Sequence, residues 1–153
     1  MVKSFQGVRQ VKPTKEPVQP VHVEDYMTRQ LITFRPEQTM EEVIKILLTK
    51  RISGGPVVDE EGNLVGIISE GDCLKEVVRG KYNNTPTLHG TVREHMATEV
   101  KTMAPEMNIF DAARMFLELK LRRFPVLKDG RLLGQISQRD VMRAVQSLKN
   151  STW

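Results

Sequence analysis

The 153-residue sequence has little of what several classes of protein require. It contains one cysteine, Cys73, which excludes an intramolecular disulfide and a multi-cysteine metal site on one chain. No apolar run approaches the roughly 20 residues that a membrane-spanning helix needs, so we expect no membrane role. The basic residues of the first 20 positions are not followed by an apolar segment, which argues against a secretory signal. A cytoplasmic location is therefore expected.

Catalytic side chains are also scarce. The three histidines, His22, His89 and His95, include no pair at the helical i, i+4 spacing and belong to no recognisable motif. Cys73 follows Asp72 at an expected helix start, where a thiol pKa can be lowered, but a buried, small apolar role is the commoner use of such a cysteine. We therefore expect a protein that is not an enzyme, with no catalytic residues and no metal ligands.

Aromatic residues are too few for a surface that stacks nucleic-acid bases. They make up 5% of the chain, and no pattern of alternating basic and aromatic residues is present. The net charge of +4 lies entirely in residues 91–153, which carry 11 basic and 7 acidic side chains. Such a local excess favours an anion site over a nucleic-acid groove.

An internal repeat organises the sequence. Residues 23–27 (VEDYM) match residues 92–96 (VREHM) at an offset of 69. Residues 66–72 (GIISEGD) match residues 134–140 (GQISQRD) at an offset of 68, because one residue is dropped in a turn. The repeat divides the chain into an extended arm (1–21), a first repeat (22–80), a linker (81–90), a second repeat (91–149) and a tail (150–153).

Both repeats predict the same order of elements. Residues 31–34 and 100–103 have the composition of short strands, each stopped by a nearby proline. A stripe of apolar residues at helical spacing follows, beginning at Met40 in one repeat and at Ile109 in the other. Turn residues between two short apolar runs then predict a hairpin, and a second helix comes after it. Each repeat is thus a β-α-β-β-α unit.

One unit of about 50 residues is too small to bury a sufficient core, whereas two units together approach the size of an ordinary domain. We therefore predict an α/β (α+β) fold in which the two repeats pack sheet to sheet as a pseudo-twofold pair. Each repeat is expected to depend on the other for its stability.

The order and duplication of short motifs resemble the cystathionine-β-synthase-type (CBS) domain pair. Each repeat has Met-Thr or Met-Ala before a short strand, a Pro-Val strand start, and Gly-x-Ile-Ser-x-x-Asp leading into a helix. The resemblance extends from residue 23 to about residue 148. It implies a homodimer with two clefts per chain that bind an adenosyl ligand: AMP, ADP, ATP or S-adenosylmethionine. No cofactor is required.

The two Ser-x-x-Asp elements are the candidate ligand-binding motifs. Ser69 and Ser137 stand at a strand-to-helix junction, where free N–H groups and the helix dipole attract anions such as phosphate. The resemblance assigns Asp72 and Asp140 to the hydroxyls of a ribose. The alternative is that each element only caps its helix, and one residue can serve both roles.

Basic residues distinguish the two repeats. Arg122, Arg123 and Arg139 lie near Asp140, where the first repeat has serine and glycine. Because arginine holds phosphate bidentately, we expect the better nucleotide site around Asp140. The alternative is that these arginines form a solvated helix end. The resemblance places five further residues near the adenine: Thr28, Ile32, Val57, Val100 and Val126.

The expected function is regulatory. A nucleotide bound in the cleft between the repeats would stabilise one arrangement of the two, and the change would pass to an effector protein. The alternative is a structural dimerisation module that does not respond to nucleotides.

Overall fold

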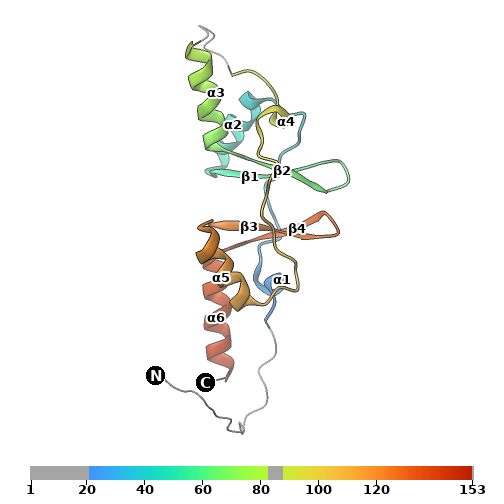
Figure 1. The fold of residues 1–153 in the computed structure, drawn as a ribbon, viewed down its shortest axis with the longest axis vertical. Helices are drawn as coiled ribbons and strands as arrows, with labels where there is room; N and C mark the ends of the chain where they lie inside the picture. The colour runs from blue at the N-terminus through green and yellow to red at the C-terminus, as the bar shows by residue number, and fades with distance from the viewer. Residues whose placement is uncertain (1–20, 83–87, 153) are drawn as a thin grey trace.

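The computed structural model describes residues 21–82 and 88–152, which form an elongated molecule with two similar halves (Figure 1). The first half comprises α2 (Met40–Lys50), β1 (Gly54–Val58), β2 (Leu64–Ser69) and α3 (Glu70–Tyr82). The second half comprises α5 (Ile109–Leu119), β3 (Arg123–Lys128), β4 (Arg131–Ser137) and α6 (Gln138–Thr152). Most of the predicted arm, the middle of the predicted linker and the last residue lie outside the described residues.

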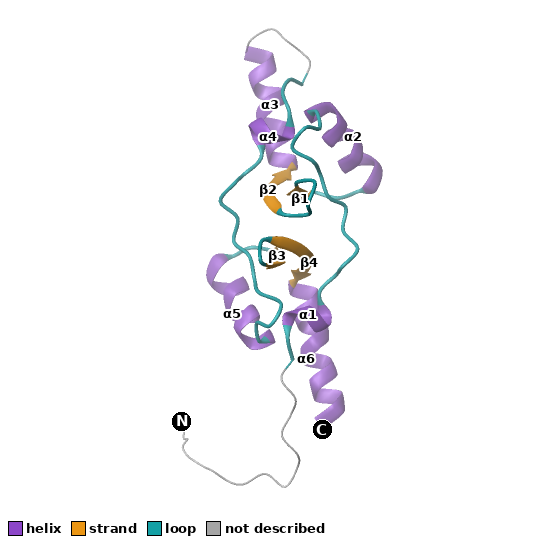
Figure 2. Cartoon of the chain, turned by 90° about the vertical axis from the view of Figure 1, so that its right-hand side faces the viewer, coloured by secondary structure: helices purple, strands orange, loops and turns teal. Residues whose placement is uncertain are grey.

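Each half is built on one antiparallel hairpin, β1 with β2 and β3 with β4. The two hairpins face each other at the middle of the molecule, and the helices lie on the outer side of each hairpin (Figures 1 and 2). The predicted α/β fold, with two repeats packed sheet to sheet, is confirmed.

The first predicted strand of each repeat is shorter than the sequence suggests. Phe34 forms a single parallel bridge to Val57, and Met103 forms the same bridge to Val126. The Phe34 N–H donates to the Pro56 carbonyl at 2.9 Å, and the Phe34 carbonyl accepts from the Val58 N–H at 2.9 Å. A proline two residues further along ends the extended segment in each case.

The helices that follow these bridges begin and end at specific residues. Thr39 caps α2 in a capping box, in which its hydroxyl accepts from the Glu42 N–H and the Glu42 carboxylate accepts from the Thr39 N–H. The helix ends at Arg51, whose φ of 57° is left-handed, and α5 ends in the same way at Lys120. This sharp end turns the chain directly into β1 and β3, and it places Arg51 beside the first hairpin.

Two short helices cross between the halves. The helix α1 (Val23–Tyr26) precedes the first half in sequence but lies against the second half, and α4 (Val92–His95) precedes the second half but lies against the first (Figure 2). Val23 is fully buried in the core of the second half, and Val92 in that of the first. The Val23 N–H donates to the Met107 carbonyl at 2.9 Å, and the Val92 N–H donates to the Gln38 carbonyl at 2.8 Å. Neither core is therefore complete without residues from the other repeat.

The two cores take an aromatic ring from different positions of the repeat: from Phe34, before α2, in the first half and from Phe124 of β3 in the second. A Cβ added to Gly55 would lie 3.0 Å from the Phe34 ring, so the absence of a side chain there makes room for that ring. In the second half the equivalent positions are Phe124 and Met103. The Phe124 ring packs edge to face on Phe116 with centroids 4.8 Å apart. The pair Phe34 and Gly55 in the first half and the pair Met103 and Phe124 in the second each supply one aromatic ring, so both cores are filled. As a result, β1 has no side chain at position 55.

Asp59 organises the turn between β1 and β2. Its Oδ1 accepts from the backbone N–H groups of Asn63 at 2.8 Å and Glu61 at 3.0 Å, and its Oδ2 accepts from Asn63 Nδ2 at 3.2 Å. The hydrogen bond from the Asn63 backbone is the main reason that the pKa of Asp59 lies below its ordinary value.

We expect Asp59→Ala to lower the thermal unfolding midpoint by about 2–4 °C at pH 7, because three hydrogen bonds to the carboxylate are lost. The carboxylate stabilises the fold above its unfolded-state pKa of about 4, and this contribution is lost as the pH falls through the lower folded-state pKa. The difference between the two proteins should therefore shrink below about pH 4. Calorimetry across this range measures it. Glu60→Ala, an exposed neighbour, is the control, and equal midpoints for Asp59→Ala and wild type at pH 7 would contradict the assignment.

Candidate functional site

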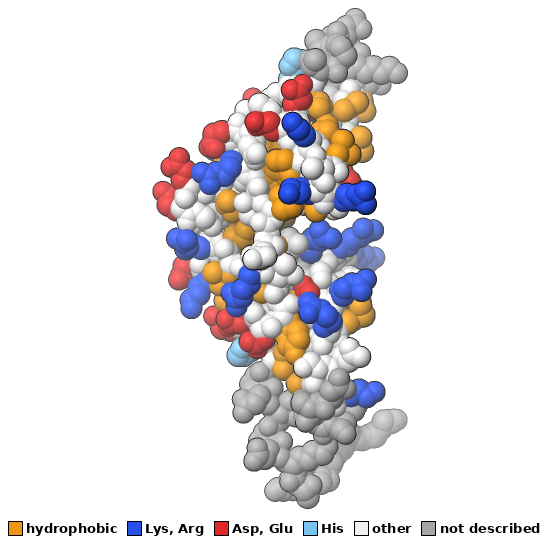
Figure 3. All heavy atoms as spheres, turned by 180° about the vertical axis from the view of Figure 1, so that it is seen from behind, with side chains coloured by type: hydrophobic (Ala, Val, Ile, Leu, Met, Phe, Trp, Pro, Cys, Tyr) orange, Lys and Arg blue, Asp and Glu red, His pale blue; other side chains and the backbone are white. Residues whose placement is uncertain are grey.

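A cavity lies between the two hairpins. Its volume is about 130 Å³, and it adjoins an open hollow of about 500 Å³ that shares Ser53 and Arg123 with it. Figure 3 shows the molecule from behind, with an indentation at mid-height on its right-hand edge and Lys and Arg side chains above and below that indentation. The two spaces together reach the 300–1,000 Å³ typical of small-molecule sites. The cavity is lined by Ser53, Gly54, Gly55, Ile67, Ile68 and Ser69 from the first half and by Arg123, Pro125 and Gln135 from the second.

The hollow beside the cavity carries charged groups from both halves. Arg51 comes from the end of α2, Glu70 from the first position of α3, and Arg123 from the start of β3. Their net charge is +1, and the N-terminal end of α3 adds the positive end of a helix dipole. This part of the site is therefore suited to an anionic group that carries a small charge.

The Ser-x-x-Asp element of the first half reaches the cavity through Ser69, which lines it, whereas Asp72 does not. Oδ2 of Asp72 accepts from the Ser69 N–H at 2.8 Å and from the Ser69 hydroxyl at 3.1 Å. Within residues 21–82 and 88–152, no hydrogen bond reaches Oδ1 of Asp72. Asp72 is only partly buried, so this second carboxylate oxygen is available to an added donor.

In the equivalent element of the second half, both carboxylate oxygens of Asp140 already have hydrogen-bond partners. Ser137 and Asp140 form a full capping box, because the Asp140 N–H donates to the Ser137 hydroxyl at 3.2 Å and the Ser137 N–H donates to Oδ2 of Asp140 at 2.9 Å. Oδ1 of Asp140 is held by the guanidinium of Arg143, one helical turn further along α6. The Asp140 side chain is 7% exposed. Both of its oxygens are thus already engaged.

The three predicted arginines have different positions. Arg123 pairs with Ser137 in the β3–β4 ladder, yet its side chain lines the cavity beside Ser69 of the first half. Arg122 and Arg139 are exposed and do not line the cavity or the hollow. The structure therefore brings Arg123 to the cavity beside Ser69 of the first half, whereas the sequence predicted a site around Asp140 with Arg139 and one of Arg122 and Arg123.

None of the five residues predicted near the adenine lines the cavity. Val57 of β1 and Val126 of β3 are fully buried in the two cores. Thr28 exchanges two backbone hydrogen bonds, at 2.8 and 2.9 Å, with Gln135 of the cavity wall. The carbonyl of Ile32 lies close to Gly55, and the Ile32 side chain is exposed. Val100 is partly buried and does not line the cavity.

Sequence reasoning missed Arg51, Gln135 and Arg143. Arg51 could have been suspected because a basic residue directly follows the apolar stripe of a helix that leads into the Ser-Gly-Gly segment. Arg143 lies three residues after Asp140, a spacing at which opposite charges meet on one helix face. Gln135 gave no signal, because the cross-strand contact that places it depends on tertiary packing.

Cys73 lies next to this site but takes no part in its chemistry. It is 4% exposed and belongs to the core of the first half, as the buried alternative predicted. Burial raises its thiol pKa, and the nearby carboxylates of Asp72 and Glu70 raise it further. A thiol of this kind is a poor nucleophile at neutral pH.

Comparisons with known proteins agree on one family. The model of the CBS domain family matches residues 23–79 and 92–147. CBSX1, a chloroplastic CBS domain-containing protein of Arabidopsis thaliana, is 31% identical over 84% of this chain, and the chain spans 66% of its length. The structure of CBSX2 in complex with AMP is 31% identical, with a TM-score of 0.71 over 84% of this chain and 98% of the other. The CBS pair of MJ0100, in complex with 5′-methylthioadenosine and S-adenosyl-L-methionine, is 27% identical, with a TM-score of 0.67 over 84% and 98% of the two chains.

The described part of the chain lacks two classes of feature. None of its helices is both long and apolar enough to cross a bilayer. Among residues 21–82 and 88–152, no three His, Cys, Asp or Glu side chains are grouped as a metal site would require.

We expect Cys73 to react slowly with iodoacetamide in the native protein and completely in urea, because the thiol is buried and its pKa is raised. Mass spectrometry of timed samples measures the extent of labelling. A Cys73→Ser, Lys75→Cys variant supplies a matched exposed thiol two residues further along the chain. Native labelling of Cys73 at the rate of that exposed thiol would show that the site is open to solvent.

Proposed function

This chain belongs to the CBS domain family, and we propose that it is a regulatory module that binds an adenine nucleotide in the cavity between its two halves. The observation that carries the proposal is that Ser69 and Arg123 line this cavity, Arg51 and Arg123 line the hollow that adjoins it, and Ser69 is hydrogen-bonded to Asp72, whose Oδ1 is free. The AMP bound to CBSX2 and the adenosyl ligands bound to MJ0100 support the same class of ligand.

Each part of a nucleotide has a complementary group here. Oδ1 of Asp72 can accept a hydrogen bond from a ribose hydroxyl. The guanidinium groups of Arg51 and Arg123 can bind phosphate, and arginine is the side chain best shaped for that contact. The apolar side chains of Ile67 and Pro125 offer a surface for the base. The net charge of +1 in the hollow favours AMP over ATP.

Binding at this place would couple the two halves. The cavity takes residues from both hairpins, so a ligand in it contacts both and stabilises the arrangement in which they fit it. The module acts by passing this change to an effector protein rather than by catalysing a reaction. A reducing compartment such as the cytoplasm suits its single buried thiol.

We expect AMP at about 100 times its dissociation constant to raise the thermal midpoint by about 5–10 °C, because a ligand that binds only the folded state stabilises it. ADP, ATP and S-adenosylmethionine should raise the thermal midpoint in the order of their affinities. GMP is the control for the base, and it should raise the midpoint less than AMP does. Differential scanning fluorimetry measures each shift. No shift with any adenosyl ligand up to 10 mM, an order-of-magnitude limit for weak regulatory sites, would reject the proposal.

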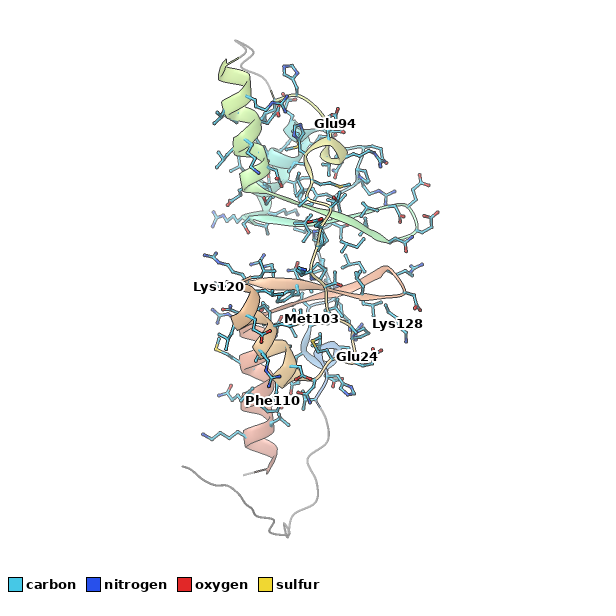
Figure 4. The ribbon with its side chains drawn as sticks, viewed as in Figure 1. Glu24, Glu94, Met103, Phe110, Lys120 and Lys128 are labelled. Atoms are coloured by element: carbon cyan, nitrogen blue, oxygen red, sulfur yellow. The ribbon has the colours of Figure 1, made fainter. Side chains whose placement is uncertain are left out.

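Arg123→Gln tests the phosphate contact. We expect it to weaken AMP binding about tenfold or more while leaving adenosine binding nearly unchanged, because only AMP offers a phosphate to the guanidinium. Lys128→Gln is the matched control. It removes a cation from the other end of the same strand, β3, and Figure 4 shows Lys128 at the far end of this hairpin from Lys120. Isothermal titration with both ligands measures the change. Equal loss of AMP and adenosine would place Arg123 outside the phosphate contact.

A second candidate function, dimerisation, is favoured by exposed apolar side chains on the outer helices. Leu74 of α3 is 64% exposed and Leu117 of α5 is 78% exposed, and such residues mark an interaction site where several of them gather on one surface. Others lie on the same four helices: Leu48, Val77, Val78, Phe110, Met142 and Val145. We propose that a second copy of the chain covers these helix faces, so that the protein is a homodimer.

We expect Leu74→Glu combined with Leu117→Glu to convert a dimer into a monomer, because a charge on each face would have to be buried without a partner. Light scattering after gel filtration measures the mass. Lys101→Glu, an exposed change outside the outer helices, is the control. A monomeric wild type would reject the dimer, and a dimer without any nucleotide response would favour the structural module.

A further inference from the structure

The two Ser-x-x-Asp elements differ in one decisive contact. In the second half, Arg143 of α6 binds Oδ1 of Asp140, the same oxygen that is free in Asp72. The residue at the equivalent place in α3 is Lys75, which forms no ion pair with Asp72 or with any other described residue. The repeat thus has an open carboxylate in one half and an occupied carboxylate in the other.

We propose that Arg143 acts as a built-in occupant of the second site, so that each chain binds one nucleotide, at Asp72 in the first half. This inference rests on the proposed function. It reverses the order expected from the sequence, in which the arginines near Asp140 favoured the second site. Those arginines were considered as phosphate ligands, and Arg143 was not considered. Arg143 competes with the ribose for the Asp140 carboxylate.

The competition follows from what each partner offers to Asp140. Both a ribose hydroxyl and the Arg143 guanidinium would donate to an ionised carboxylate, but only the guanidinium also brings a positive charge that attracts it. The pair is also intramolecular and lies on one helix at i, i+3, so no association entropy opposes it. The Asp140 side chain is 7% exposed and the Arg143 side chain 56% exposed, so the guanidinium covers the buried carboxylate from the solvent side. A ribose would therefore have to displace Arg143 before it could reach the carboxylate.

The shape of the cleft leads to the same assignment. The cavity is lined by Gly54, Gly55 and Ser69, whereas Ser137 does not line it. Neither aspartate lines it directly, but Asp72 accepts two hydrogen bonds from Ser69, which does. At the positions equivalent to the two glycines, the second half has Arg123 and the buried Phe124. The second half instead contributes the Arg123 side chain to the cavity of the first. One half thus holds the ribose and the other supplies a phosphate ligand.

The Arg143 side chain is 56% exposed, so it can leave Asp140 and enter solvent without disturbing the core. Removing its charge should therefore open the second site and leave the capping box of α6 in place. For this reason Arg143→Gln is a sharper test than any change to Asp140 itself, which also caps the helix.

The experiment is isothermal titration of the full chain with AMP. The wild type should bind one AMP per chain, and Arg143→Gln should bind two, with the affinity of the first site unchanged within about twofold because the substitution leaves Asp72, Arg51 and Arg123 in place. Arg114→Gln is the matched control, since Arg114 is another exposed arginine placed i, i+3 from an aspartate, Asp111 of α5.

Asp72→Asn should abolish binding in the wild-type background and leave one site in the Arg143→Gln background. Arg143→Lys, which copies the first half, should change the stoichiometry in the same direction.

The outcomes separate this inference from the proposed function. Two AMP per chain in the wild type, or one per chain in both Arg143→Gln and Arg143→Lys, would overturn the role of Arg143 while leaving nucleotide binding intact. Retention of AMP by Asp72→Asn in the wild-type background would overturn the assignment to the first half. Binding of AMP by none of these proteins would instead reject the proposed function itself.

Discussion

The backbone hydrogen bonds that tie α1 to the second half and α4 to the first are the constraint on which the rest of the structure depends. Through them Val23 and Val92 each complete the core of the repeat to which they do not belong in sequence. A unit of about 50 residues buries too little apolar surface to be stable alone, and this exchange makes the two halves stable only together. It also fixes the two hairpins face to face, so the cavity between them is a direct result of how the cores are completed.

The Ser-x-x-Asp element shows how a structural and a functional role share one carboxylate. Each aspartate has two oxygens, and one of them accepts from the backbone N–H of the serine, which fixes the start of the helix. Only the other oxygen remains for a ligand. At Asp72 it is free, and at Asp140 it is bound to Arg143. Capping and binding are therefore not competing explanations of the motif, because they use different oxygens of the same group.

The sequence predicted the fold well because the fold depends on local patterns that occur twice. The apolar stripe that begins at Met40, the cap at Thr39 and the turn at Asp59 each act within a few residues, and all lie where the pattern indicated. The site was predicted less completely, because its geometry comes from packing between distant segments. Nothing near Arg123 in sequence shows that its side chain borders a cavity of the other half, and the exchange of α1 and α4 leaves no local pattern at all. Val57 and Val126 fit the family's motif, yet their burial in the cores is a property of the folded sheet.

Divergence between the halves follows a physical logic, because the cores and the cleft are under different constraints. A core must stay filled, so the loss of a side chain at Gly55 is matched by the ring of Phe34, and the smaller Met103 is matched by the ring of Phe124. The cleft need not be filled by side chains, since water can occupy it, but the backbone around it still limits what each position accepts. An added Cβ at Gly54 would lie 2.5 Å from the Ile68 carbonyl oxygen, whereas the equivalent position of β3 carries Arg123. The two repeats thus keep equivalent buried cores but differ at the cleft, where the first half presents Gly54, Gly55 and Ser69 and the second half presents Arg123.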